Sequence, residues 1–173
     1  MRQILYVAVC FAVLAVSAGA QNPVRCSMKE GSQFDFWIGK WHVEWKTASG
    51  ETERGTNTIS KILGDCVIQE VFDGGGKTPL KGMSHSVYDA RAKMWKQTWV
   101  DDTGSYLDFV GEFKDGKMTL WREFTNPQGK KVKQRMIFFN IAKDSLDWNW
   151  DSSTNDGRTW NTNWHITYKR QKS

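Results

Sequence analysis

The chain has 173 residues, of which 13% are aromatic and 25% are charged, and its formal net charge is +5 at pH 7. This length is enough for one domain with a sizeable hydrophobic core. The basic excess is small and mostly scattered, so we expect no nucleic-acid partner. Beyond residue 20 no apolar stretch is long enough to predict a membrane-spanning helix.

The first 20 residues have the pattern of a secretory signal peptide. Arg2 supplies the positive start, Ile4–Val16 is almost wholly apolar, and Ala18–Ala20 forms a small-x-small cleavage site. The apolar run is too short to span a bilayer comfortably. We therefore expect cleavage after Ala20, a secreted or periplasmic location, and one domain formed by residues 21–173.

The rest of the chain shows almost no helical periodicity. Strand-like runs recur instead, separated by turn signals rich in Gly, Asn and Asp, which tolerate positive φ or cap their own backbone. The predicted strands cover residues 36–47, 51–62, 65–73, 79–89, 93–102, 105–114, 117–125, 130–141, 145–152 and 158–170.

The short connections predict that successive strands are antiparallel neighbours. An open meander of about ten strands would leave two edges to protect, whereas closing the sheet removes both edges and leaves room inside. We therefore predict an all-β fold, a closed antiparallel up-and-down β-barrel of about ten strands.

The first predicted strand alternates large apolar and polar residues. Trp41, Val43 and Trp45 share one face, which we assign to the interior, and Trp41 is expected to plug one end of the barrel. If the last strand closes beside the first, Arg170 can place its guanidinium on the Trp41 ring in a cation–π contact.

These residues carry a family resemblance. Gly39–Trp41 with Arg170 near the end of the last strand resembles the lipocalin/calycin superfamily. The chain is most similar to a mostly bacterial group of lipocalin-like exported proteins, a domain-of-unknown-function family without an established activity. The matching blocks are Phe34–Trp41 (F-D-F-x-x-G-x-W), Gly82–Asp89 (G-x-S-x-x-x-Y-D), Trp95–Asp101 (W-x-Q-x-W-x-D) and Ser153–Trp160 (close to S-x-D-G-x-T-W). The resemblance implies a barrel fold and leaves the function open.

The faces assigned to the interior are unusually rich in tryptophan. A packed core favours Val, Ile and Leu, and a buried indole N–H needs a partner, so this composition favours a cavity walled by rings. In the last strand, alternation places Trp160 and Thr162 on the same inward face as Trp164. The predicted cavity walls are Trp95, Trp99, Trp148, Trp150 and Trp164.

Several polar residues also fall on inward faces, where a buried charge is costly unless it is paired. They are expected to orient the polar end of a ligand, to pair with each other, or to be turned outward by a bulge. The predicted polar residues are Glu70, Gln97, Arg122 and Gln134. The glycine-rich turn Asp73–Lys77 is expected to form a lid at the barrel mouth.

Three functions are consistent with this pattern. The first is binding of a small hydrophobic or aromatic molecule inside the barrel. The second is an enzyme on the same scaffold, with Glu70 in general acid–base chemistry and Arg122 as electrostatic stabiliser. The third is a protein-interaction module that uses the face shared by Lys131, Lys133 and Arg135, which is otherwise a solvated sheet face.

No metal or cofactor is predicted, because the cysteines and the three histidines show no ligand spacing. Alternation turns His42 and His165 outward, while His85 can face either side. An inward His85 would allow haem-iron ligation, which some ten-stranded calycin relatives use.

Cys26 and Cys66 remain after signal cleavage, and an even number of cysteines in an exported chain predicts a disulfide. It would close a loop of about 40 residues and stabilise the fold by about 3–4 kcal/mol; the alternative is two unpaired thiols. Thiol reagents should label neither residue in the folded, unreduced protein and both after reduction and unfolding. Labelling of both without reductant would contradict the disulfide.

Overall fold

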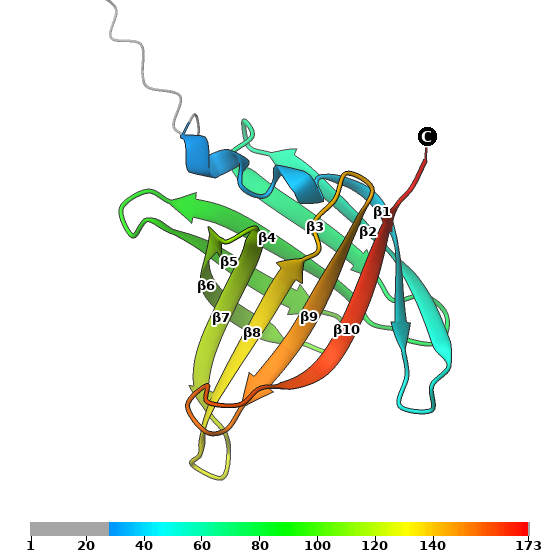
Figure 1. Ribbon diagram of the computed structural model, residues 1–173, viewed down its shortest axis with the longest axis vertical. Helices are drawn as coiled ribbons and strands as arrows, with labels where there is room; N and C mark the ends of the chain where they lie inside the picture. The colour runs from blue at the N-terminus through cyan, green and yellow to red at the C-terminus, as the bar shows by residue number, and fades with distance from the viewer. Residues whose placement is uncertain (1–27, 173) are drawn as a thin grey trace, which may run out of the picture.

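The computed structural model describes residues 28–172, which form a closed barrel of ten antiparallel strands (Figure 1). Each strand pairs with the next in the chain, and the last pairs with the first, so the predicted fold is confirmed. The strands are β1 (Gly39–Lys46), β2 (Thr52–Ile62), β3 (Val67–Asp73), β4 (Lys81–Asp89), β5 (Met94–Asp101), β6 (Tyr106–Lys114), β7 (Lys117–Thr125), β8 (Lys131–Phe139), β9 (Ser145–Ser153) and β10 (Asn161–Arg170). Cys26 and the predicted signal peptide lie outside the described residues.

Two short 3-10 helices, η1 (Lys29–Ser32) and η2 (Asp35–Trp37), precede the first strand. They cross one end of the barrel (Figure 1). The predicted first strand therefore begins three residues too early, because the aromatic run that starts it belongs partly to η2.

The segment around η2 closes this end of the barrel. Phe34 and Trp37 are almost fully buried, and their rings lie 4.8 Å from Trp95 and 4.9 Å from Phe138 respectively, measured between centroids. The indole N–H of Trp41 donates to the Trp37 carbonyl oxygen over 2.7 Å. Trp41 is thus one part of a larger aromatic plug.

The seam between β1 and β10 is held by Arg170. Its guanidinium lies 4.0 Å from the Trp41 ring centroid, as predicted, and donates to the carbonyl oxygens of Ile38 over 2.6 Å and Phe36 over 3.1 Å. Gly39 has φ of 131°, and a Cβ there would collide with the Arg170 guanidinium. The absence of a side chain at Gly39 therefore lets Arg170 on β10 bind both the plug and β1.

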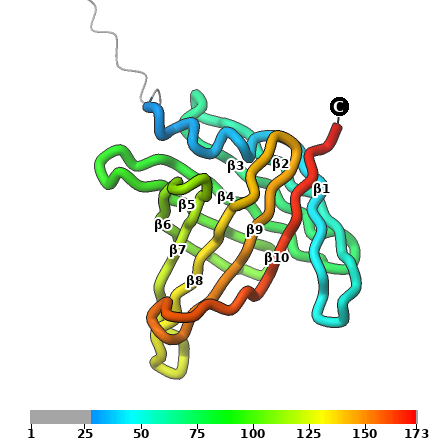
Figure 2. Tube along the Cα trace, viewed as in Figure 1, coloured from blue at the N-terminus to red at the C-terminus, as the bar shows by residue number. Residues whose placement is uncertain are grey.

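Two seams of the barrel are only partly paired. Among the described residues, β1 pairs with β10 only over Trp41–Glu44, and β6 pairs with β7 only over Val110–Lys114. The strands therefore fall into two groups, β1–β6 and β7–β10. The hairpins of the two groups diverge away from the plugged end (Figure 2), which separates a closed end from an open one.

The inward facing predicted for Trp160 and Thr162 is wrong, because the register of β10 against β9 shifts between Thr162 and Trp164. Such a β-bulge inserts one residue and reverses the facing of everything before it. Trp160 consequently lies outside the barrel, 4.0 Å beneath the Arg135 guanidinium, and the Thr162 hydroxyl donates to Asp151 over 2.8 Å.

Replacing Arg170 with Lys keeps the charge but removes the guanidinium that donates to the carbonyl oxygens of Lys143, Ile38 and Phe36 and covers one ring. We expect the free energy of unfolding to fall by about 2 kcal/mol in urea titrations. The matched control is Lys169→Arg on the exposed face of the same strand, which should change it by less than about 0.5 kcal/mol. Equal losses in the two variants would show that Arg170 does not hold the seam.

Candidate ligand-binding cavity

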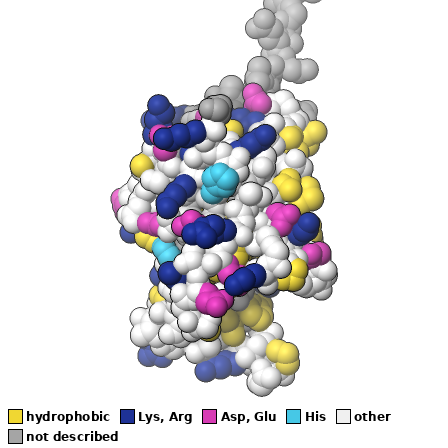
Figure 3. Space-filling view, turned by 90° about the vertical axis from the view of Figure 1, so that its right-hand side faces the viewer, with side chains coloured by type: hydrophobic (Ala, Val, Ile, Leu, Met, Phe, Trp, Pro, Cys, Tyr) yellow, Lys and Arg dark blue, Asp and Glu magenta, His cyan; other side chains and the backbone are white. Residues whose placement is uncertain are grey.

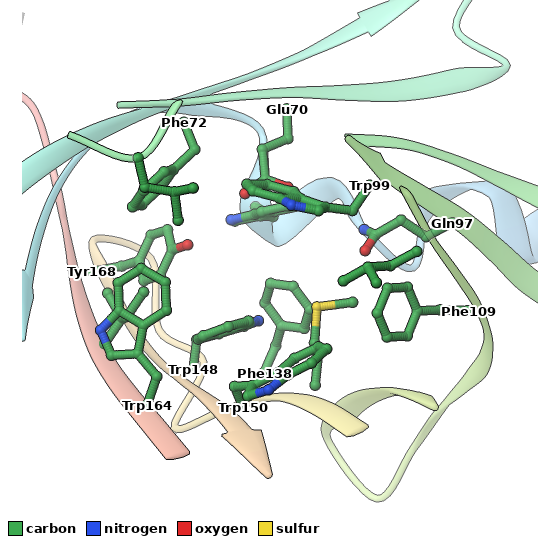
Figure 4. A pocket seen from close by; sticks show the side chains of 15 residues that line it. Glu70, Phe72, Gln97, Trp99, Phe109, Phe138, Trp148, Trp150, Trp164 and Tyr168 are labelled. Carbon is green, nitrogen blue, oxygen red and sulfur yellow. The ribbon is translucent and has the colours of Figure 1, made fainter. Parts of the chain in front are cut away.

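A cavity of about 160 Å³ lies inside the barrel beyond the aromatic plug (Figure 4). Its wall is almost entirely apolar and aromatic, with a few polar groups on one side. The lining residues are Trp37, Glu70, Phe72, Leu80, Gln97, Trp99, Leu107, Phe109, Met136, Phe138, Trp148, Trp150, Trp164, Ile166 and Tyr168.

Space for the cavity comes from the small inward residues of β4. Gly82, Ser84 and Ser86 are all fully or nearly fully buried and alternate along the inner face of that strand. A Cβ on Gly82 would collide with the Trp99 ring of the neighbouring strand. The Trp99 indole therefore packs directly on the backbone of Gly82. In this position the ring forms a wall of the cavity and does not fill it.

The orientation of Trp99 is fixed by Asp101, whose carboxylate accepts a hydrogen bond from the Trp99 indole N–H over 2.9 Å. Partial burial acts to raise the pKa of Asp101, but the hydrogen bonds from Thr103, Trp99 and Ser105 outweigh it and hold the pKa well below its usual range. Asp101 is thus an ionised anchor at neutral pH, and it accounts for the W-x-D end of the W-x-Q-x-W-x-D block.

The opposite wall is built from β9 and β10. Trp148 stacks on Trp150 with ring centroids 6.4 Å apart and meets Trp164 edge-to-face at 5.9 Å. Trp164 in turn contacts Trp45 edge-to-face at 5.3 Å. Such pairs each contribute about 0.5–1.5 kcal/mol beyond burial, which holds partly exposed rings in place at the open end.

Glu70 is the carboxylic acid of the cavity wall. It is only 7% exposed, and its carboxyl oxygens accept hydrogen bonds from Asn57 Nδ2 over 2.7 Å and from Ser84 Oγ over 2.6 Å. Burial raises the pKa of Glu70, and the two hydrogen bonds oppose this only in part. The carboxyl group of Glu70 therefore takes up a proton more readily than an exposed glutamate does.

Tyr168 lies next to Glu70 on the same side of the cavity. Its hydroxyl oxygen accepts a second hydrogen bond from Asn57 Nδ2 over 3.1 Å. Burial, and then the nearby charge of Glu70, raise the pKa of Tyr168 well above its usual value. Tyr168 consequently stays neutral at any physiological pH.

Gln97 extends the polar wall along β5. Its Nε2 donates to Ser86 Oγ over 2.8 Å, and its amide end points toward the cavity (Figure 4). Within residues 28–172 its Oε1 accepts no hydrogen bond. The amide is thus half satisfied by protein and half available to a ligand.

The structure brings six of the nine residues predicted for the site together around the cavity. The six are Glu70, Gln97, Trp99, Trp148, Trp150 and Trp164. Trp95 instead belongs to the plugged end, where its indole N–H donates to Gln33 Oε1 over 2.9 Å. Strand alternation predicts whether a residue faces inward but not its position along the barrel axis. Trp95 was therefore assigned to the cavity although it lies at the plugged end.

Arg122 and Gln134 do not line the cavity either. They are cross-strand partners on β7 and β8. The Arg122 guanidinium lies at the partly paired seam, 4.9 Å from the Phe124 ring centroid and 5.9 Å from that of Phe109. Arg122 therefore packs on aromatic faces, and no ion pair joins it to Glu70 in the described part of the chain.

Other lining residues were not predicted as site residues. Phe72, Met136, Phe138, Ile166 and Tyr168 share the inward parity of their strands, so the alternation already contained that signal. Trp37 also had the parity of Trp41 within the predicted strand 36–47, but in the structure it precedes β1 and reaches the cavity through the turn of η2.

The turn between β3 and β4 lies at the mouth of the cavity and contributes Leu80 to the lining. The Thr78 hydroxyl of this turn donates to Glu53 on β2, and Lys77 forms an ion pair with Glu51 in the turn before β2. These contacts place the predicted lid segment at the mouth; its motion stays a prediction.

The histidines offer no ligand to the cavity. His42 and His165 are exposed on the outer surface, and His85 is hydrogen-bonded to Gln69 over 3.1 Å on the outer face of the sheet. The inward orientation of His85 required for haem ligation is therefore wrong. Within residues 28–172 no group of three or more His, Cys, Asp or Glu side chains lies close enough to hold a metal ion.

The basic outer face of β8 is paired with acidic side chains. Lys133 lies 2.6 Å from Asp156, Lys131 lies 3.3 Å from Glu123, and Arg135 lies 2.9 Å from Asp151. Figure 3 shows another side of the barrel, the right-hand side of Figure 1, where basic and acidic side chains are also interspersed and hydrophobic side chains are visible inside a recess. This mixture lowers the net positive potential available to an acidic partner.

Comparisons with known proteins identify no family. No protein-family model matches the chain, and no curated protein matches it. Among solved structures, a redesigned β-barrel is similar with 13% sequence identity and a TM-score of 0.41, over 84% of this chain and 98% of that chain. Within residues 28–172 no helix has the length and hydrophobicity needed to cross a membrane.

The raised pKa of Glu70 makes stability depend on pH. A carboxyl group whose pKa is higher in the folded state contributes stability below its unfolded pKa, and this contribution is lost as pH rises through the folded pKa. The unfolding free energy of the wild type should therefore fall relative to Glu70→Gln between about pH 4 and about pH 8.

Urea titrations at each pH measure this difference. The control is Glu112→Gln, which removes the same charge from an exposed position of β6 and should stay parallel to the wild type. A constant difference between wild type and Glu70→Gln across the pH range would show that Glu70 is not perturbed by burial.

Proposed function

We propose that this is an exported, lipocalin-like protein that binds a small hydrophobic or aromatic molecule in its tryptophan-lined cavity. The observation that carries the proposal is the 160 Å³ space between aromatic walls with polar atoms gathered on one side. A mostly apolar pocket with a few converging polar groups is the usual form of a small-molecule site.

The size of the cavity restricts the ligand. An apolar protein cavity of about 150 Å³ binds benzene, so the space observed matches one aromatic ring with a short substituent. A haem or a long lipid chain is much larger, and would require the two groups of strands to move apart.

Export is supported by the signal-peptide pattern of residues 1–20. The lipocalin-like assignment is supported by the order of the four sequence blocks and by the positions that their residues occupy. Gly82, Ser84, Gln97 and Trp99 from the second and third blocks all build or border the cavity wall. The motif residues are therefore the ones that a shared internal cavity would require.

Two alternatives are less well supported. The enzyme hypothesis combined Glu70 with Arg122, and the Arg122 side chain lies at the seam between β6 and β7 and not in the cavity. The protein-interaction hypothesis relied on the face of Lys131, Lys133 and Arg135, which is paired with carboxylates. Binding inside the barrel requires neither arrangement.

Filling the cavity tests the proposal. Leu107 lines the cavity, whereas its neighbour Tyr106 is 65% exposed on the outer face of the same strand. Leu107→Trp should occupy much of the space and weaken binding of 2-phenylethanol at least tenfold, or about 1.4 kcal/mol, in isothermal titration calorimetry.

Tyr106→Trp adds a similar ring outside and should bind like the wild type, and circular dichroism should show both variants folded. Binding of 2-phenylethanol that is equal in the two variants would place the site elsewhere. Absence of binding of millimolar 2-phenylethanol and of its charged analogues phenethylamine and phenylacetate to the wild type would contradict a site for small aromatic molecules.

A further inference from the structure

The cavity contains a single acidic residue and no base. Of the residues that line it, only Glu70 and Tyr168 carry ionisable side chains, and no Lys, Arg or His is among them. An ionised carboxylate in an apolar environment is costly unless a positive charge pairs with it. In the described part of the protein that positive charge is missing from the site.

The hydrogen bonds already present around Glu70 are those that a carboxylate needs. Asn57 and Ser84 both donate to its oxygens. Asn57 Nδ2 can only donate and the Ser84 hydroxyl can donate or accept, so both neighbours are able to bind the ionised carboxylate. The site is therefore prepared for a charge that burial alone disfavours.

One further polar atom of the wall, Gln97 Oε1, can accept a hydrogen bond from a ligand. Gln97 Oε1 faces the cavity and accepts no hydrogen bond from residues 28–172, while its Nε2 is used by Ser86. A ligand that presents N–H groups can satisfy both Glu70 and Gln97. An ammonium group has three such donors and no acceptor.

The rings around the cavity attract the same kind of group. The faces of Trp, Tyr and Phe carry negative electrostatic potential, and a cation within about 6 Å of a ring centroid gains about 0.5–2 kcal/mol. Phe72 and Trp99 lie 6.3 Å apart between centroids and border the side of the cavity that contains Glu70 (Figure 4). The Glu70 carboxylate and the aromatic ring faces therefore both attract a cation.

We propose that the ligand is a small aromatic amine that binds as the ammonium cation, with its nitrogen at Glu70 and its ring between Trp99 and the tryptophans of β9 and β10. This inference rests on the proposed function, and names the chemical class of the ligand. An anionic ligand is disfavoured by the same geometry, because the cavity wall offers it no cation.

Binding of the amine is coupled to the ionisation of Glu70. Burial raises the pKa of Glu70 in the empty cavity, and an ammonium ion pairs with the ionised carboxylate, so affinity should fall as the pH is lowered and Glu70 becomes protonated. The groups that face Glu70 are Asn57 on β2, Ser84 on β4 and Tyr168 on β10. None of the three titrates between about pH 5 and pH 8, so the change reports on Glu70.

The experiment uses three probes of nearly the same shape and different charge: phenethylamine, 2-phenylethanol and phenylacetate. Tryptophan fluorescence of the signal-cleaved protein measures their affinities between about pH 5 and pH 8. We expect phenethylamine to bind at least tenfold more tightly than 2-phenylethanol at the upper end, phenylacetate to bind most weakly, and only the amine to weaken toward low pH.

Glu70→Gln should lower the phenethylamine affinity at least tenfold and remove its pH dependence. Glu112→Gln removes the same charge outside the barrel and should bind the amine like the wild type. If Glu70→Gln fails to fold, the comparison of the three probes and the pH series on the wild type still decide the question.

Equal affinities for phenethylamine and 2-phenylethanol in the wild type would overturn the amine inference and leave the proposed function intact. Tighter binding of phenylacetate would overturn it in the same way. Failure of all three probes to bind would overturn the inference together with the proposed small aromatic ligand.

Discussion

The arrangement of the protein depends on one tie, in which Arg170 joins the last strand to the first. Its guanidinium covers the Trp41 ring and serves the carbonyl oxygens of Ile38 and Phe36. Since β1 and β10 pair over only a few residues, this side chain supplies contacts that a full ladder would otherwise provide. It also anchors the segment that plugs one end, and so determines which end of the barrel stays open.

The contrast between the two ends explains why a cavity persists inside a barrel of this size. At the plugged end, the buried rings of Phe34, Trp37 and Trp95 pack against one another. Toward the open end, the inward residues of β4 are as small as Gly82 and Ser84, so the facing tryptophans cannot meet across the gap. Edge-to-face contacts hold those rings as walls, and the space between them is part of the folded structure.

Glu70 connects stability with the proposed binding. The carboxyl group is buried among neutral partners, which disfavours its charge, yet Asn57 and Ser84 are placed to stabilise that charge. An ionised carboxylate in this environment lowers the unfolding free energy of the empty protein, and pairing with a bound cation offsets that loss. Sites that sacrifice stability for function commonly show such a conflict between local charge and environment.

The sequence by itself determined the strands, their antiparallel order, closure, and the facing of most inward residues, because alternation and turn chemistry are local. It also identified the contact of Arg170 with Trp41 and six of the residues around the cavity. The height of each side chain in the barrel was decided only by the tertiary structure, since it depends on the stagger between strands; Trp95 and Arg122 were misplaced for this reason. The bulge before Trp164 turned Trp160 outward, and the partners of Glu70 came from strands distant in sequence. Pairing geometry, not composition, therefore decided the site.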